Sequence, residues 1–218
     1  VVREELYSYN TVAKVSPLKG LDPLWYAKRK LVPFGEYVPF PFTFIPGLSR
    51  LVGPIGNFTS GDDFQPISLS GGNKDELTIG PLICYEDIFP SLARGAALAG
   101  NDLIFVSTND AWFGEEGCAE QHAAHSVLRA IETGLPVLRC GNAGWSGWID
   151  PMGRKRDVLK DENGSIYFEG AGVITLHLQK RRGGVYAKMG DFFPVCCLLM
   201  VIFFMSWSLM RPRNSSKA

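Results

Sequence analysis

The sequence lacks a pattern of cysteines that would indicate disulfide bonds. Its 218 residues contain five cysteines, an odd number, and no Cys-x-x-Cys pair. A disulfide framework is therefore not expected, even for a domain in an oxidising compartment. Two of the cysteines, Cys196 and Cys197, are adjacent within a long apolar run. We interpret them as lipid-facing or packing side chains.

An excess of charge of either sign is also missing. Lysine and arginine total 22, aspartate and glutamate total 22, and the formal net charge is zero. No basic stripe alternates with aromatic residues, so nucleic acid is not expected as a partner. The chain has no Gly-x-Ser-x-Gly elbow, no Walker loop and no internal repeat. Its length suits one core, or one domain with an appendage.

What the sequence does contain is an uncharged run of nineteen residues, 192–210, near its end. As a helix it would be about 28 Å long, close to the hydrocarbon thickness of a bilayer. Pro194 suits the first turn of a helix, and Trp207 suits an interfacial anchor. A buried core helix is the alternative, but a terminal helix this apolar all round has little to pack against. We therefore predict a transmembrane helix, whose orientation the nearly balanced flanking charges do not decide.

The chain has no initiator methionine and no signal-peptide pattern, and it opens on Val1 as if within a domain. We expect it to be the carboxyl-terminal part of a longer protein. The predicted organisation is a catalytic domain over residues 1–190 that is incomplete at its start, the span over 192–210, and a short basic tail over 211–218.

Strand-like and helix-like patterns alternate along the domain, which favours an α/β sandwich with helices outside and sheets inside. One helix is expected over residues 118–133, where Ala119, Ala123 and Ala130 share a face. A turn is expected over residues 150–153. The expected strands cover residues 6–15, 24–31, 77–83, 103–106, 136–140, 145–149 and 173–178.

Residues 37–61 form an unusual segment, rich in proline and glycine and interleaved with Phe40, Phe42 and Phe44. A loop this long within a domain is typically functional or mobile. Two interpretations stay open: a packed surface loop, or an apolar lid that dips into lipid beside an active site.

Cys84 is the strongest candidate for a catalytic residue. It directly follows the apolar run 77–83, which indicates a buried strand, and polar groups come next. Enzymes often place a nucleophile at the end of a buried strand, beside the N–H groups that open the next segment. A lone cysteine is more often a buried structural residue, so the interpretation depends on the segments around it.

Three segments together resemble a known family. Residues 26–36 contain Tyr-x-Lys-x-x-Leu-Val-Pro-Phe-Gly-Glu, residues 83–86 read Ile-Cys-Tyr-Glu, and residues 109–114 read Asn-Asp-Ala-Trp-Phe-Gly. In this order and at this spacing they resemble the carbon–nitrogen hydrolase (nitrilase) superfamily, and within it the apolipoprotein N-acyltransferases of bacterial envelopes. The resemblance covers nearly the whole chain and implies a four-layer α-β-β-α sandwich.

The resemblance also implies roles for particular residues. Cys84 would be the nucleophile and Lys28 the catalytic lysine, although spacing alone does not separate Lys28 from Arg29 and Lys30. Glu36 would be a carboxylate that supports the lysine.

Two residues that follow the cysteine are further candidates. Tyr85 would present a backbone N–H to the oxyanion, and Glu86 would either support the site or serve only a structural turn. The family's general base, a glutamate, would lie before Val1. Glu4 and Glu5 stand in the wrong context for it, so we expect these 218 residues alone to be inactive.

The implied reaction passes an acyl chain from a phospholipid, through a Cys84 thioester, to the amino-terminal diacylglyceryl-cysteine of an apolipoprotein. The expected partners are therefore a phospholipid donor, a lipoprotein acceptor and the membrane, without a metal or organic cofactor. The expected location is the bacterial inner membrane, with the catalytic domain on the periplasmic side. Alternatives are an amidase of the same superfamily that acts on a soluble amide, and a non-catalytic membrane-bound remnant.

A competing arrangement lies on the predicted helix 118–133. Cys118, His122 and His125 fall at positions i, i+4 and i+7, which share one face and suit a zinc ion. Such spacing often arises by chance and no fourth ligand is evident, so a metal site is the weaker interpretation.

Overall fold

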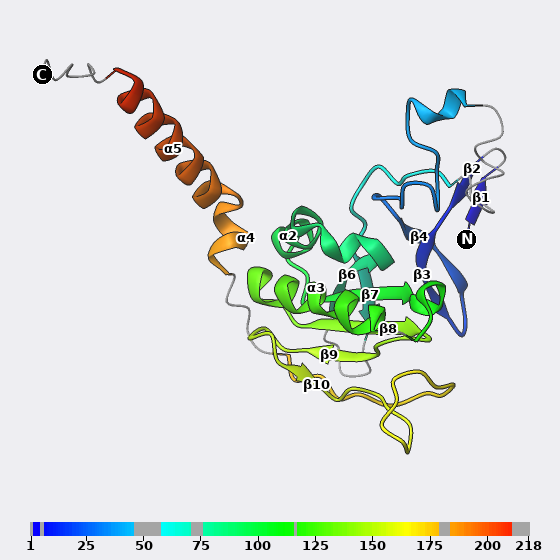
Figure 1. The fold of residues 1–218 in the computed structure, drawn as a ribbon. Helices are drawn as coiled ribbons and strands as arrows, with labels where there is room; N and C mark the ends of the chain where they lie inside the picture. The colour runs from blue at the N-terminus through cyan, green and yellow to red at the C-terminus, as the bar shows by residue number, and fades with distance from the viewer. Residues whose placement is uncertain are drawn as a thin grey trace, which may run out of the picture.

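The structure is a computed structural model that describes residues 2–4, 7–45, 58–70, 76–115, 117–178 and 184–210 (Figure 1). A six-stranded sheet forms its centre, in the order β10-β9-β8-β7-β6-β5. Strands β6, β7 and β8 are parallel to one another, and the other neighbours pair antiparallel. The strands are β5 (Ile67–Ser70), β6 (Glu76–Ile83), β7 (Leu103–Asn109), β8 (Val137–Asn142), β9 (Gly147–Ile149) and β10 (Lys155–Arg156).

Two helices connect the parallel strands and cover one face of this sheet (Figure 1). Helix α2 (Pro90–Leu98) joins β6 to β7, and helix α3 (Cys118–Thr133) joins β7 to β8. The bounds of α3 confirm the predicted helix. Because α2 and α3 are crossovers between parallel neighbours, the carboxyl ends of β6, β7 and β8 meet at one edge of the sheet.

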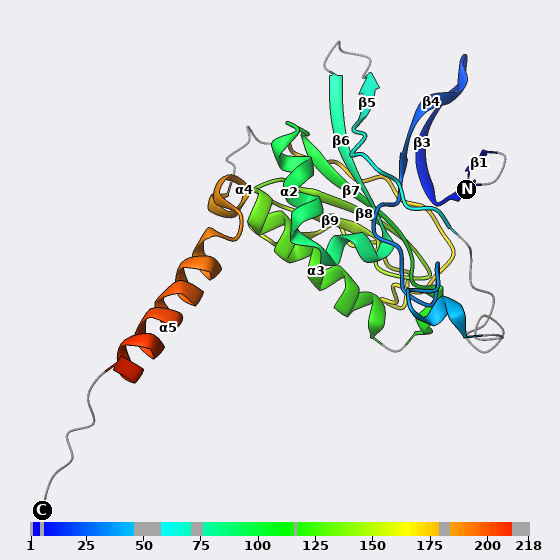
Figure 2. The ribbon, with the colours of Figure 1, turned by 90° about the horizontal axis from the view of Figure 1, so that it is seen from above.

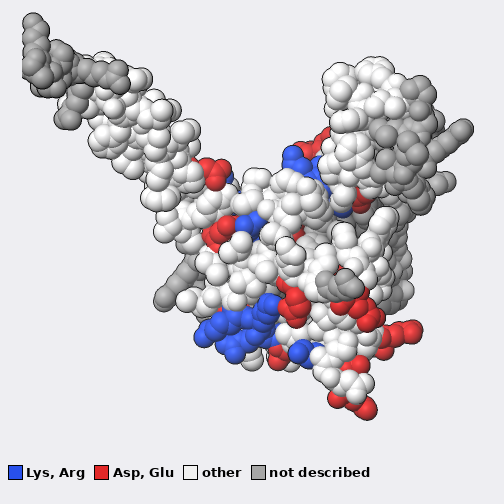
Figure 3. Space-filling view, in the orientation of Figure 1, with Lys and Arg blue, Asp and Glu red and all other residues white. Residues whose placement is uncertain are grey.

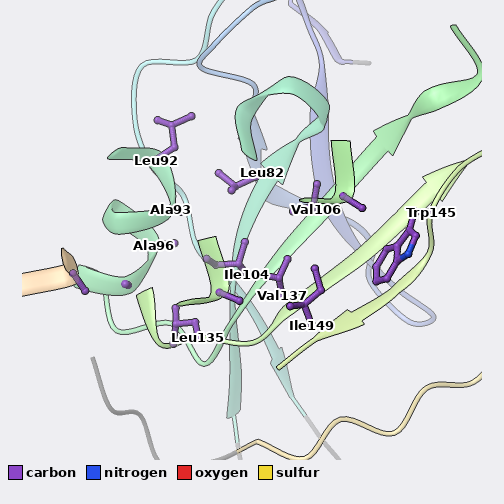
Figure 4. Packing of buried hydrophobic residues seen from close by; sticks show 14 of the residues in the cluster. Leu82, Leu92, Ala93, Ala96, Ile104, Val106, Leu135, Val137, Trp145 and Ile149 are labelled. Carbon is purple, nitrogen blue, oxygen red and sulfur yellow. The ribbon is translucent and has the colours of Figure 1, made fainter. Parts of the chain in front are cut away.

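The sheet buries both of its faces, as strand alternation requires. Leu82, Ile104 and Val106 belong to the larger core cluster, which also contains residues of α2 and α3 (Figure 4). Ile79 and Leu103, which lie an odd number of residues away on the same strands and so face the other way, belong to a second cluster. Val12 of the amino-terminal region packs against this second cluster, so another layer of structure lies on the face opposite the helices.

That layer is a pair of strands, β3 (Thr11–Ser16) and β4 (Gly20–Ala27), which pair antiparallel. They are preceded by β1 (Val2–Glu4) and β2 (Tyr7–Tyr9). The single strand predicted for residues 6–15 is therefore wrong, since β2 and β3 are separated at Asn10. The peptide carbonyl of Asn10 instead accepts a hydrogen bond from the Lys28 N–H at 2.8 Å.

Two other strand predictions need correction. The strand predicted for residues 24–31 stops at Ala27, so Lys28 and Lys30 do not share a strand face. Residues 173–178 alternate but form no strand within the described part of the chain. Val173 is 99% exposed, while Leu176 packs on the second core cluster. An alternating pattern shows which side chains can be buried, but it does not supply a partner strand.

The aromatic segment 37–61 is described in part, because residues 46–57 lie outside the described residues. A short 3-10 helix, η1 (Phe42–Phe44), follows Pro41. Phe40 is 79% exposed and Phe44 is 75% exposed. Phe40 and Phe44 therefore face outward, as a lipid-dipping loop would require.

The chain ends in two helices, α4 (Val185–Met189) and α5 (Phe192–Met210). Among the described residues, α5 is the one helix long and apolar enough to cross a membrane, and none of its most apolar stretch is buried. It leads away from the domain (Figure 2) and presents an uncharged surface (Figure 3). Its bounds coincide with the run predicted from the sequence.

We predict that α5 anchors the domain to membranes. The expressed chain should sediment with membranes and resist carbonate extraction, since an exposed apolar helix of this length is favoured in lipid. Deletion from Phe192 onward should weaken this association, measured as the fraction of protein in the membrane pellet. Full release after the deletion would show that the outward-facing aromatic loop does not bind lipid.

Candidate active site

The polar residues that end three neighbouring strands meet at the carboxyl edge of the central sheet. Cys84 follows β6, Asn109 ends β7 and Asn142 ends β8. The side-chain amide of Asn142 donates to the side-chain oxygen of Asn109 at 3.0 Å. Loops at the carboxyl ends of parallel strands are a common place for catalytic residues, because a rigid sheet positions them.

Cys84 has an unusual backbone conformation. Its φ is +52°, in the left-handed region that non-glycine residues rarely adopt. It opens the 3-10 helix η2 (Cys84–Ile88) directly after β6. A strained residue between a strand and a helix is the geometry in which hydrolases present a nucleophile. The side chain is half-buried, so it is accessible at the sheet edge.

The carboxylate of Glu86 holds this turn in place. The side chain is fully buried, and Oε2 accepts from the Ile83 N–H at 2.8 Å and from the Tyr26 hydroxyl at 2.8 Å. Oε1 accepts from the N–H groups of Arg29 at 2.7 Å and Lys30 at 3.1 Å. Burial raises the pKa of Glu86, and these four hydrogen bonds oppose that increase. With no surface open to a substrate, Glu86 can act only by positioning its neighbours.

Lys28 lies in a buried ion pair with Glu36. Lys28 is 1% exposed, and its Nζ lies 2.9 Å from Oε1 and 2.8 Å from Oε2 of Glu36. The Val32 N–H and the Asn10 side-chain amide also donate to this carboxylate, at 2.8 and 3.3 Å. The supporting contact between Glu36 and the lysine is therefore present in the structure.

Glu86 brings the lysine segment and the cysteine turn together. One carboxylate binds the N–H just before Cys84 and the N–H just after Lys28. The backbones that carry the two side chains are thus separated by the width of a single carboxyl group. The sequence left two roles open for Glu86, support of the site or a structural turn, and these contacts join the two segments through its buried carboxylate.

The two competitors of Lys28 point elsewhere. Lys30 is exposed, and its ammonium lies 6.0 Å from the centre of the Phe89 ring. The Arg29 guanidinium stacks on Tyr26 and Phe64, at 5.9 and 5.5 Å. Of the three cations, Lys28 is the one buried beside a carboxylate, so burial separates candidates that spacing could not.

Tyr85 occupies the second position of η2, where N–H groups have no partner within the helix. Its ring packs edge-on against Phe89, with centroids 5.2 Å apart. The side chain is thereby fixed while the backbone N–H lies next to Cys84. This position suits an oxyanion donor.

A buried polar network lies beneath the same edge and was not predicted from the sequence. His122 of α3 bridges two carboxylates: Nδ1 lies 2.8 Å from Asp110 Oδ1, and Nε2 lies 3.1 Å from Asp87 Oδ1. Asp87 Oδ2 accepts from the Ser126 hydroxyl at 2.7 Å and from Arg139 Nη1 at 2.6 Å. The network ties η2, the turn that follows β7, α3 and β8 to one another.

The charges of this network compensate one another. Burial alone would lower the pKa of His122, but its hydrogen bonds to Asp110 and Asp87 raise the pKa to about 9. Burial would raise the pKa of both aspartates, yet His122 and Arg139 hold each of them below the usual value. With His122 protonated, two buried cations face two buried anions. Buried charges are tolerated when they are paired in this way.

Gly144 is required by this network. A Cβ at this position would lie 2.4 Å from Asp110 Oδ2, closer than any real contact. The loop after β8 can therefore approach Asp110 only because residue 144 has no side chain.

The zinc arrangement predicted as the weaker alternative is not formed. Within the described residues, no group of three or more possible ligands could hold a metal ion. His122 uses both ring nitrogens on aspartates instead. The signals that could have found this network were the aspartates Asp87 and Asp110 just after two buried strands and Arg139 within a third strand.

Comparison with known proteins identifies the family of this chain. The family model described as carbon-nitrogen hydrolase matches residues 3–174. The chain belongs to the carbon–nitrogen hydrolase family. The family membership and the α/β architecture confirm the predicted nitrilase-type fold.

Curated relatives carry a more specific name. An apolipoprotein N-acyltransferase from Geobacter metallireducens is 40% identical over 172 residues, which are 78% of this chain and 30% of the relative. One from Azotobacter vinelandii is 40% identical over 193 residues, 88% of this chain and 35% of the relative. The chain thus spans about a third of the length of these relatives. Among solved structures, an amidase from Nesterenkonia sp. superposes with a TM-score of 0.48 at 22% identity, covering 68% of this chain and 50% of the amidase.

We predict that replacement of His122 by glutamine lowers the stability of the fold. Loss of one partner of a buried ion pair costs about 3 to 5 kcal/mol. Because the pKa of His122 rises from 6.5 to about 9 on folding, its contribution is complete below pH 6.5 and is lost as the pH rises through 9. The difference in free energy of unfolding between wild type and His122→Gln should therefore shrink over that range.

The measurement is urea unfolding in detergent, followed by tryptophan fluorescence at several pH values. His125→Gln on the same helix is the matched control and should behave as wild type. A difference that stays constant from pH 6 to pH 10 would contradict a protonated His122.

Proposed function

We propose that this chain carries the nucleophile, lysine and supporting carboxylate of an apolipoprotein N-acyltransferase. Cys84 on its strained turn, one carboxyl group away from the Lys28–Glu36 segment, is the observation that carries the proposal. The names of the curated relatives supply the reaction class. The acyl donor would be a phospholipid, and the acceptor the amino-terminal diacylglyceryl-cysteine of an apolipoprotein.

In the first half-reaction, the thiolate of Cys84 would attack the ester carbonyl carbon of the phospholipid. The Cys84 S–C bond forms, the ester C–O bond breaks, and the lysophospholipid leaves as an alcohol after taking a proton. The Lys28 ammonium and the Tyr85 N–H would stabilise the oxyanion between these events. Glu36 would hold the Lys28 side chain in place.

In the second half-reaction, the free amine of the acceptor would attack the thioester carbonyl. An amide bond forms, the C–S bond breaks, and Cys84 returns to its starting state. Both steps need a group that takes and returns a proton. Glu36 and Glu86 are each committed to several donors, so we assign this role to the glutamate that the family resemblance places before Val1.

The membrane location of both substrates fits the exposed apolar features of the chain. Helix α5 would span the bilayer, and the domain would lie on the periplasmic face of the bacterial inner membrane. Trp112 and Phe113, in the 3-10 helix η3 (Asp110–Phe113) beside the site, are 71% and 58% exposed. A family member that hydrolyses a soluble amide would need neither the helix nor these aromatic side chains.

We predict that Cys84 alone carries the acyl group. In the full-length gene product, Cys84→Ser should abolish a hydroxylamine-labile palmitate adduct, because an oxygen ester resists neutral hydroxylamine and serine is the poorer nucleophile. Cys118→Ser and Cys140→Ser should keep the adduct. Labelling that survives the loss of Cys84 would sink the assignment.

We also predict that replacement of Lys28 lowers the rate of acyl transfer far more than replacement of Lys30. Lys28→Ala removes the buried cation and leaves Glu36 unpaired, so acyl transfer should fall by a factor of about 10² to 10³. Lys30→Ala removes an exposed side chain and should change the rate by less than about threefold. Both variants are compared with wild type by the rate of acyl transfer to a diacylglyceryl peptide. The reverse ranking would show that a different lysine serves the site.

A further inference from the structure

The short helix α4, which precedes the apolar helix α5, is fastened to the domain by one side chain of α2. Arg94 Nε donates to the carbonyl oxygen of Ala187 at 3.1 Å, and its Nη2 donates to that of Lys188 at 3.3 Å. Carbonyls in the last turn of a helix have no partner within the helix. Arg94 satisfies two of them with one guanidinium group.

Close packing seats α4 against both surface helices. Ala187 is 2% exposed and belongs to the main core cluster together with Ala93 and Ala97 of α2. At the start of α4, a Cβ on Gly184 would lie 2.5 Å from the carbonyl oxygen of Glu132 in α3. Backbone therefore touches backbone there, and α4 is part of the domain rather than a free linker.

Helix α2 is packed in turn on β6, the strand that directly precedes Cys84. A Cβ on Gly80 of β6 would lie 2.6 Å from the Cβ of Ala96, so strand and helix are in direct contact. Helix α2 also begins at Pro90, just after η2 ends at Ile88. One helix thus separates α4 from the nucleophile strand, and α4 lies beside α2 in both ribbon views (Figures 1 and 2).

In the described part of the chain, helix α5 leaves its apolar stretch unburied, and it starts just after α4 ends. Its apolar stretch is 0% buried, and it begins at Phe192, after only Gly190 and Asp191. The Gly190 N–H donates to the carbonyl of Tyr186 at 2.7 Å and ends α4, and the Val195 N–H donates to the carbonyl of Asp191 at 3.1 Å at the start of α5. Because two residues separate the helices, the position of α4 limits where α5 can begin.

We propose that Arg94 is a positioning residue, which clamps α4 to α2 and so sets the height and tilt of the Cys84 edge relative to the bilayer. This inference rests on the proposed function, because the height and tilt of the Cys84 edge affect the reaction only if the substrates lie in the membrane. A donor dissolved in water reaches Cys84 at any tilt. A phospholipid whose ester is held at the interface reaches Cys84 only when the edge of the sheet faces it at the right depth.

The clamp can be tested without any enzymatic activity. Spin labels at Asn163 of the domain and Ser208 of α5 in the full-length protein, in lipid nanodiscs, give the distribution of distances between them. It should be narrow in wild type and clearly broader in Arg94→Ala. Arg94→Lys should be intermediate, because a lysine ammonium lacks the guanidinium fork. Ser91→Ala, an exposed change on the same helix, should match wild type. Equal widths in wild type and Arg94→Ala overturn the clamp.

The effect on the reaction is tested with two acyl donors, a phospholipid in vesicles and a short water-soluble thioester. Arg94→Ala should acylate Cys84 about tenfold or more slowly from the phospholipid, and within about twofold of wild type from the soluble donor. Equal losses with both donors would assign Arg94 to the fold alone and overturn its positioning role. If Arg94→Ala acylates Cys84 from the phospholipid at the wild-type rate, the positioning role is also overturned.

A second variant keeps Arg94 and its contacts. Insertion of Gly-Ser-Gly after Asp191 frees α5 from α4 while leaving the domain unchanged, and it should cause the same loss with the vesicle donor only. An insertion variant as active as wild type in vesicles overturns the proposal. If wild-type Cys84 reacts with neither donor, the proposed function fails, and the distance distributions still decide whether the clamp exists.

Discussion

One buried carboxylate, that of Glu86, is the constraint on which the candidate site depends. It accepts hydrogen bonds from the backbone on both sides of the site, at Ile83 before the cysteine and at Arg29 and Lys30 after the lysine. These segments come from opposite layers of the fold and are more than fifty residues apart in sequence. Without this carboxylate, three backbone N–H groups would lose their partners in the interior, a costly arrangement that the fold avoids.

The paired charges below the sheet edge also hold the turn that carries Cys84. Asp87 follows Glu86 in η2 and is bound by Arg139 and His122, so the turn is held from beneath as well as from the side. The strain stored at Cys84 is sustained because its surroundings are fixed by these contacts. On the outer side, α2 connects the turn to α4 and hence to the apolar helix. The turn that carries Cys84 thus lies between the buried ion pairs on one side and helix α2 on the other.

Much of the fold could be predicted from the sequence because the information is local. The apolar runs before Cys84 and Asn109, the helix Cys118–Thr133 and the helix Phe192–Met210 are set by periodicity and composition. The buried partners of Glu86, Asp87 and His122 could not be predicted in this way. They pair residues that are distant in the chain, and no local pattern encodes which segments will meet. For the same reason, the alternation over residues 173–178 suggested a strand that does not form.

The central claim is that Glu86 joins the nucleophile turn to the lysine segment. Single-turnover acylation of Cys84 from a phospholipid, compared between wild type and Glu86→Gln, tests it most directly. Glutamine has nearly the same shape but presents an NH₂ group where the site offers only donors, so the two segments should separate. We expect acylation to slow by about 10²-fold, with Glu120→Gln, an exposed glutamate paired with Lys155, as an unaffected control. A Glu86→Gln variant that acylates Cys84 at the wild-type rate would contradict the account.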